Sequence, residues 1–171
     1  MKPGLKILLS VFFLMVSSFA FSQELNMGSI MGTSIESKKL TPFLVGGTVE
    51  FRPAHSVVSF VAEPNLMFYS DNKPIFTFPL YLKFSSEKKF RIGPVFGLFI
   101  RSTGNYGWSA GGEADIQVKE KGFVFIRGDF VMDYWTEISY GYRTGGKYTD
   151  NASSVFITLG FRKEILKKSK K

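Results

Sequence analysis

The segment Ile75–Phe84 alternates strictly between bulky apolar residues and a mixed set that includes a proline, a tyrosine and a lysine. The apolar members are Phe76, Phe78, Leu80, Leu82 and Phe84. Successive side chains of an extended strand point to opposite faces, so a period of two gives this strand one apolar face and one partly polar face. The same alternation recurs along most of the chain and predicts an all-β fold.

The N-terminal residues have the pattern of an export signal. Lys2 and Lys6 supply a basic region, residues 7–16 an apolar stretch, and a small-x-small cleavage site follows. We therefore expect a signal peptide over residues 1–20, with cleavage after Ser22 as the alternative. The apolar stretch is short for a spanning helix and no stop-transfer pattern follows it, which makes an uncleaved anchor the weaker interpretation.

The rest of the chain is long enough for one domain, and no Pro-, Gly- or Ser-rich linker divides it. The chain has no cysteine, so the disulfide framework that many small secreted domains need is excluded. The stability of an exported domain of this kind must come from another source. A closed ladder of strands in lipid would supply it.

Eight stretches of period two lie between turn signals, and we predict a strand for each of them. They are residues 25–34, 43–52, 57–69, 74–84, 90–101, 106–119, 122–134 and 153–163. Most reach the length of roughly 9–11 residues that a tilted strand needs to cross the hydrocarbon core of a bilayer. An even number of strands lets both termini of a single-chain bacterial barrel lie on one side, which we expect to be the periplasm.

The connections between these strands differ in length. The predicted periplasmic turns are 53–56, 85–89 and 120–121, and the predicted outer loops are 35–42, 70–73, 102–105 and 135–152. The longest connection falls on the outside, as is typical of outer-membrane barrels. Its candidate surface contacts are Trp135, Tyr140, Tyr142, Arg143, Lys147 and Tyr148.

Alternation alone does not say which face points inward, because a soluble lipocalin-like barrel places its apolar face inside. One predicted face is large, apolar and uncharged, and includes Val45, Phe51, Phe96, Phe130 and Leu159. The opposite face combines small residues, mainly glycine, serine and threonine, with six positive and six negative side chains. The charged members are Glu50, Arg52, Glu63, Lys83, Arg91, Arg101, Glu113, Asp115, Arg127, Asp129, Asp133 and Arg162.

A narrow lumen needs small side chains for room and paired charges for mutual satisfaction, whereas a solvated surface needs neither. We therefore predict an eight-stranded antiparallel up-and-down transmembrane β-barrel with a charge-paired, largely filled lumen, and keep the soluble barrel as the alternative. Pro64 and Pro79 interrupt the ladder, because proline lacks a donor and a closed barrel has no edge, so we expect bulges or local pairing gaps there. Aromatic residues near the outer strand ends are expected to form an interfacial girdle. They are Tyr69, Tyr106, Trp108, Tyr134, Trp135 and Tyr140, and an ordinary loop aromatic is the alternative for Tyr140.

The run FTFPLYLKF followed by FRIGPVFGLFI resembles the outer-membrane β-barrel family of Bacteroidota often labelled porin-family or PorT-like proteins. The residues that carry the resemblance are Pro79, Leu80, Lys83, Phe84, Gly93 and Gly97, with Phe96 and Phe99 nearby. The stretches from Gly47 to Phe51 and from Glu63 to Tyr69 resemble the family's second and third strands. The resemblance covers most of the mature chain and implies an outer-membrane location and a barrel fold, with no catalytic set. The chain departs from the usual C-terminal aromatic residue, because Arg162 and a basic tail follow Phe161.

Part of the formal net charge of +8 lies at the C-terminus. The lysines there are Lys163, Lys167, Lys168, Lys170 and Lys171. We assign residues 21–163 to the barrel and residues 164–171 to a basic periplasmic tail. The tail either contacts anionic headgroups or cell-wall polymer, or only keeps the chain soluble. We favour neither hypothesis, since charge alone does not identify a partner.

The sequence predicts no catalytic, metal or cofactor site. His55 is the only histidine, and without cysteine a zinc site would need an all-carboxylate ligand set, which zinc rarely has. A Ser-His barrel hydrolase would need His55 at the outer rim, but the turn that holds it is predicted at the periplasmic end. Glu113 and Asp115 share a face with Asp129 and Asp133, and such a group of carboxylates could act in acid–base catalysis. Because arginines alternate with them on this face, we prefer to interpret them as partners in structural salt bridges.

The expected function is structural or a surface interaction through the outer loops, without enzymatic activity. A narrow porin-like channel for small solutes is the alternative, and a lipid-modifying barrel enzyme is less favoured. The expected location is the outer membrane of a Gram-negative cell. The expected partners are outer-membrane lipid and lipopolysaccharide, the barrel-assembly machinery and an envelope protein, but not nucleic acid.

Overall fold

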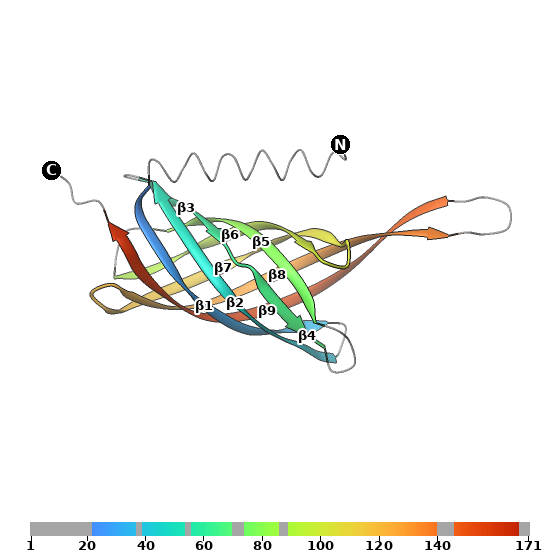
Figure 1. The fold of residues 1–171 in the computed structure, drawn as a ribbon, viewed down its shortest axis with the longest axis horizontal. Coiled ribbons are helices and arrows are strands. Elements are labelled where there is room, and N and C mark those ends of the chain that lie inside the picture. The colour runs from blue at the N-terminus through green and yellow to red at the C-terminus, as the bar shows by residue number, and fades with distance from the viewer. Residues whose placement is uncertain are drawn as a thin grey trace.

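The computed structural model describes residues 22–36, 39–53, 56–69, 74–85, 89–139 and 146–167, with the backbone alone at some strand ends, including 135–139 and 146–150. All regular structure in these ranges is β-strand (Figure 1). None of the described residues forms a helix long and apolar enough to cross a membrane.

The strands follow one another along the chain as a meander. They are β1 (Ser22–Glu36), β2 (Lys39–Pro53), β3 (Val58–Ala62), β4 (Asn65–Phe68), β5 (Ile75–Phe84), β6 (Phe90–Arg101), β7 (Tyr106–Lys119), β8 (Gly122–Ser139) and β9 (Gly146–Lys167). Each strand pairs antiparallel with its neighbours, and β1 also pairs with β9, which closes the sheet. β3 and β4 both pair with β2 and β5 and so occupy a single strand position. The predicted fold class, a closed eight-stranded antiparallel β-barrel, is confirmed.

The break between β3 and β4 coincides with two prolines. Ala62 pairs with Leu80 and Asn65 pairs with Thr77, so the register places Glu63 opposite Pro79 and Pro64 opposite Phe78. The carbonyl of Pro79 accepts from the amide of Glu63 at 3.1 Å, and that of Pro64 accepts from the amide of Gly47 at 3.0 Å. Neither proline has an N–H to donate, so the ladder is interrupted where they occupy neighbouring positions on the two strands. The local gap expected at Pro64 and Pro79 is confirmed.

Several strands are longer than predicted. The β8–β9 ladder continues to the pair Ser139 and Gly146, so much of the predicted outer loop 135–152 is strand (Figure 1). β9 also runs to Lys167 instead of ending at residue 163, because Leu25 and Glu24 of β1 pair with its last residues. A strand continues as long as a neighbouring strand satisfies its backbone N–H and C=O groups. Local turn signals do not show how far that neighbour extends, so the sequence underestimated these strands. We call the barrel end that carries Ser22 and Lys167 the terminal end, and the opposite one the hairpin end.

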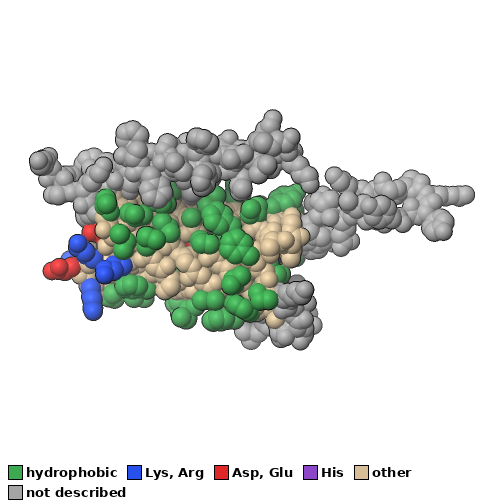
Figure 2. All heavy atoms as spheres, in the orientation of Figure 1, with side chains coloured by type: hydrophobic (Ala, Val, Ile, Leu, Met, Phe, Trp, Pro, Cys, Tyr) green, Lys and Arg blue, Asp and Glu red, His purple; other side chains and the backbone are tan. Residues whose placement is uncertain are grey.

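The predicted apolar face points away from the lumen. Most of its side chains are exposed when the chain is taken without a membrane, for example Ile92 at 69%, Leu98 at 55% and Ile126 at 51%. Phe51 is an exception at 4%. Figure 2 shows these hydrophobic side chains gathered over the outside of the barrel. An apolar surface of this extent is typical of a barrel wall in contact with lipid.

We predict that Ile126→Arg destabilises the barrel in lipid vesicles by about 2–4 kcal/mol, because Ile126 is exposed near the middle of the barrel wall. The measurement is the urea dependence of folding into vesicles, followed by gel mobility before and after boiling. Thr103→Arg, in the exposed turn after β6, is the matched control and should fold as the unmutated chain does. Equal stability of the two variants would mean that this wall does not face lipid.

Candidate functional site

The interior of the barrel holds all twelve charged side chains that the sequence predicts for the lumen. They come from β2, β5, β6, β7, β8, β9 and the break after β3. In their ion pairs none of these side chains is more than 10% exposed. Period-two alternation is the local cause, since every second residue of a barrel strand faces inward.

Arg162 of β9 spans the lumen to strands that are remote in the chain. One of its terminal nitrogens lies 2.6 Å from Glu113 of β7 and 3.2 Å from Glu50 of β2. The other lies 3.1 Å from Glu63, at the break between β3 and β4. Its Nε donates to the Thr48 hydroxyl at 3.2 Å. One guanidinium thus joins four strand positions of the barrel.

A second arginine, Arg127 of β8, shares two of these carboxylates. It forms an ion pair with Glu63 through Nη2, and its Nη1 lies 3.3 Å from Glu113. Its Nε donates to Asp129 at 2.7 Å. Lys83 of β5 extends the network, at 2.6 Å from Glu113 and 3.7 Å from Glu50. We call this set of side chains, together with Asp115, the central ion network.

One more ion pair completes the central ion network, and two others flank it. Asp115 is paired with Lys83. Arg52 lies 3.4 Å from Glu50 and also donates to the hydroxyls of Ser59 and Ser85, at 3.0 and 2.7 Å. Toward the hairpin end, Arg101 pairs with Asp133 at 2.7 Å.

Sequence reasoning missed one charged residue of the lumen. Glu24 is 5% exposed and lies 3.3 Å from Arg91, near the terminal end. The predicted first strand began at residue 25, whereas β1 begins at Ser22. Extending the alternation by one residue would have placed Glu24 on the inward face.

Three inward arginines stack on aromatic rings that lie over glycines. The guanidinium of Arg127 is 4.3 Å from the Tyr81 ring, and that of Arg162 is 3.8 Å from the Phe125 ring. Tyr81 pairs across strands with Gly97, and Phe125 with Gly160. A Cβ at Gly97 would come within 2.4 Å of the Tyr81 ring, and one at Gly160 within 2.3 Å of the Phe125 ring.

The third set repeats this arrangement toward the hairpin end. Arg101 is 5.1 Å from the Phe99 ring, Phe99 pairs with Gly107, and a Cβ there would lie 2.6 Å from that ring. The glycines leave the space in which the rings lie flat against the wall, and each ring supports a cation. Gly97, Gly107 and Gly160 therefore make room for the rings that support these arginines.

The lumen also contains an apolar layer, which corrects the expectation of an inner face made of small and charged residues. Buried side chains from β1, β2, β4, β6, β8 and β9 form one hydrophobic cluster. They are Ile30, Leu44, Met67, Phe99, Phe125, Val131 and Phe156. Each has the same parity as the charges on its strand, so the alternation rule applied to every residue would have found them.

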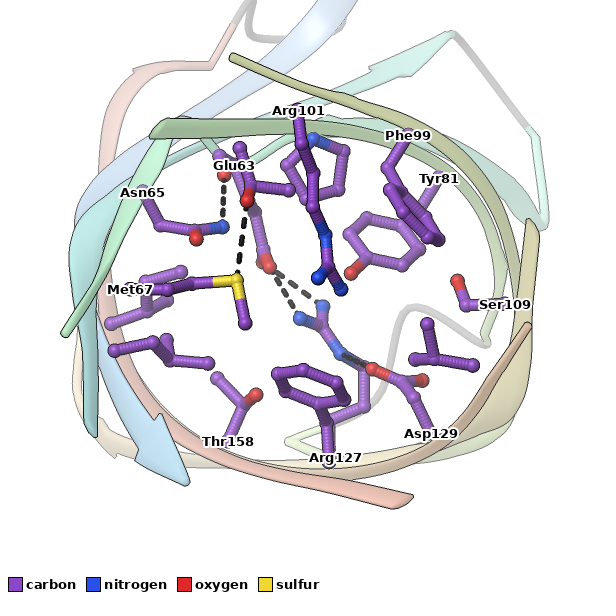
Figure 3. Close-up of a pocket in the computed structure, with 16 residues that line it drawn as sticks. Glu63, Asn65, Met67, Tyr81, Phe99, Arg101, Ser109, Arg127, Asp129 and Thr158 are labelled. Atoms are coloured by element: carbon purple, nitrogen blue, oxygen red, sulfur yellow. Dashed lines mark hydrogen bonds and ion pairs between the residues drawn. The ribbon is translucent and has the colours of Figure 1, made fainter. Parts of the chain in front are cut away.

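The part of the lumen that the structure describes contains a small cavity. A cavity of about 40 Å³ lies between the apolar layer and Arg127, and Figure 3 looks into it past Arg101, Tyr81 and Asp129. It has room for about three water molecules. Arg101 Nε and Asp129 Oδ1 are buried without a hydrogen-bond partner, and both residues line this cavity.

Every carboxylate of the suspected acid–base cluster is paired with a lysine or an arginine. Glu113 and Asp115 pair with Lys83, Asp129 with Arg127, and Asp133 with Arg101. Within the described ranges no group of three acidic or histidine side chains is arranged to hold a metal ion. This arrangement favours structural pairing over acid–base chemistry.

For several residues predicted as functional, the structure describes no side chain. His55, Tyr140, Tyr142 and Arg143 lie outside the described residues, as do residues 1–21 and 168–171. Trp135 belongs to β8, and Lys147 and Tyr148 belong to β9, with the backbone alone described. The role of these residues as surface contacts stays a prediction.

Comparison with known proteins gives a likeness in structure. No protein-family model matches the chain, and no curated protein sequence matches it. Neisserial surface protein A superposes with a TM-score of 0.53 at 9% identity, covering 83% of this chain and 96% of that one. Outer membrane protein W of E. coli gives 0.46 at 10% identity, covering 82% and 98%. The likeness to Neisserial surface protein A shows that the chain has the fold of an outer-membrane β-barrel.

We predict that Arg162→Met destabilises the folded barrel by about 3–5 kcal/mol, because it leaves buried carboxylates without a partner. Adding Glu113→Gln should recover part of the loss, since the uncompensated charge is then removed. Lys163→Met changes the next residue, which is exposed, and should stay within about 0.5 kcal/mol. Urea unfolding in detergent micelles measures all three, and additive losses in the double variant would contradict the network.

We also predict that Gly160→Ala costs about 1–3 kcal/mol, because the new Cβ would collide with the Phe125 ring. Gly128→Ala is the matched control, since nothing lies within 4 Å of the position of its Cβ. The same unfolding measurement compares them. If Gly160→Ala is tolerated as well as Gly128→Ala, the ring does not need the space that Gly160 leaves.

Proposed function

We propose that this chain is an outer-membrane β-barrel protein whose lumen is closed by its own side chains, and that it acts as a structural or surface-interaction protein. The observation that carries the proposal is Arg162, which crosses the lumen to Glu50, Glu63 and Glu113. A barrel whose non-adjacent strands are tied together in this way is a rigid frame. The exposed apolar wall, the barrel fold and the predicted export signal support the location.

The closed lumen is argued from what fills it. The central ion network and the apolar layer border a cavity of about 40 Å³. Opening a path would require Arg127 or Arg162 to leave several carboxylates at once, at a cost of several kcal/mol for each unpaired buried charge. A narrow channel for small solutes is the second candidate, favoured by the unpartnered polar atoms of Arg101 and Asp129 beside that cavity.

We propose no enzymatic activity and no cofactor. The lumen carboxylates that would serve a lipid-modifying barrel enzyme are engaged with lysine and arginine, so none is placed as a free acid or base. Membership of the porin-family or PorT-like barrels of Bacteroidota is likewise our proposal. It rests on the resemblance over Pro79–Phe84 and on Gly93 and Gly97.

The surface for interaction is the β8–β9 hairpin. This ladder runs past the barrel wall, since Tyr106 of β7 pairs with Tyr134 while β8 continues to Ser139 (Figure 1). We place the hairpin end outside the cell and the termini in the periplasm, as the longest connection of an outer-membrane barrel is extracellular. The partners are then outer-membrane lipid and lipopolysaccharide around the wall, the assembly machinery during insertion, and an envelope protein at the hairpin.

Single-channel conductance in planar bilayers tests the closed lumen. We predict that the unmutated protein gives no steady, well-resolved openings, because the ion pairs of Arg127 and Arg162 bridge the interior. Heat-modifiable mobility of the same sample on a gel is the control that the barrel is folded. Regular openings of a folded sample would reject the closed lumen and favour the channel.

Tag accessibility tests the orientation. A short epitope tag inserted between Ser139 and Gly146 should be labelled on intact cells, because that hairpin projects from the hairpin end. The same tag in the turn at Glu120 and Lys121, at the terminal end, should be labelled only after the cells are permeabilised. The reverse pattern would overturn the proposed orientation.

A further inference from the structure

Four exposed lysines gather at the terminal end of the barrel, on neighbouring strand ends. They are Lys89, Lys119, Lys121 and Lys163. The Lys89 carbonyl accepts from the amide of Gln117 at 2.8 Å, and the Lys121 carbonyl accepts from that of Glu164 at 2.7 Å. Gly122 pairs with both Lys119 and Lys163. We call these lysines the basic rim, and Figure 2 shows blue side chains at this end beside the hydrophobic wall.

Lys163 lies at the edge of the apolar wall. Its neighbours on the same face of β9 are Phe161 and Ile165, which are 42% and 55% exposed. Its partner on β1 is Met27, which is 46% exposed. The lysine therefore borders side chains that would contact lipid, while its partner on β8 is Gly122, directly after the exposed turn at Glu120 and Lys121.

The other members of the basic rim also border the apolar wall. Phe90 follows Lys89, and Val118 precedes Lys119, both more than half exposed. The acidic side chains among the described residues of this rim are Glu120, which is exposed, and Glu164, which is half-buried. The four lysines outnumber them, which leaves an excess of positive charge where the wall ends.

We propose that the basic rim binds the headgroup of an anionic phospholipid in the membrane leaflet at the terminal end. Lysine stems lie along apolar surface while the ammonium group reaches the headgroup layer, and negatively charged headgroups attract such lysines. A lipid phosphate reaches Lys163 from the side, between Phe161 and Ile165, where a soluble protein would have to displace lipid. The inference rests on the proposed function only in that the wall contacts a membrane.

The test uses native mass spectrometry of the folded mature chain in detergent with equal amounts of phosphatidylglycerol and phosphatidylcholine. The unmutated protein should retain more phosphatidylglycerol than phosphatidylcholine. Each of Lys119→Gln, Lys121→Gln and Lys163→Gln should lower the preference about fivefold, as expected for one lysine near an anionic surface. The corresponding Lys→Arg changes should keep it, and Glu120→Gln should raise it.

The possible outcomes separate the two proposals. A heat-modifiable, folded protein without lipid preference would overturn the lipid site and leave the proposed function standing. A chain that does not insert into vesicles at all would overturn the proposed function. Displacement of the retained lipid by millimolar inorganic phosphate would show a site for free phosphate, and would also overturn the lipid site. Folding of each variant is checked by its mobility before boiling.

Discussion

The pairing of buried charges across a closed lumen is the interaction on which the rest of the structure depends. Removing an ionised side chain from water costs several kcal/mol, so Arg127 and Arg162 are tolerated only because each meets more than one carboxylate. Glu63 and Glu113 are shared between them. A slip of one residue in any of these strands would turn its charges toward the outside, so the network holds the register of the barrel.

The same arginines explain the composition of the inner wall. A narrow eight-stranded lumen has little space for guanidinium groups and rings together. The cross-strand pairs Tyr81 with Gly97 and Phe125 with Gly160 resolve this by letting each ring lie flat on a glycine beneath an arginine. The lumen is thus packed with cations, rings and aliphatic side chains, which agrees with a rigid frame better than with an open pore.

Local sequence patterns predicted much of this fold. Alternation separated the two faces, and the prolines at positions 64 and 79 located the break between β3 and β4. The strand ends were predicted less well, since β8 and β9 continue to Ser139 and Gly146 through their mutual ladder. The apolar layer around Leu44 and Phe156 was missed because the inner face was judged by its charges and small residues.

The sequence by itself determined which side chains face the lumen and which face outward, because parity along a strand depends only on the chain's own spacing. Only the tertiary structure decided that Arg162 meets Glu50 and Glu113, and that Phe125 covers Gly160. These partners belong to different strands, some far apart in the chain. Which of them meet is set by the register of each pair and by the closure of β1 on β9, which no single strand's sequence contains.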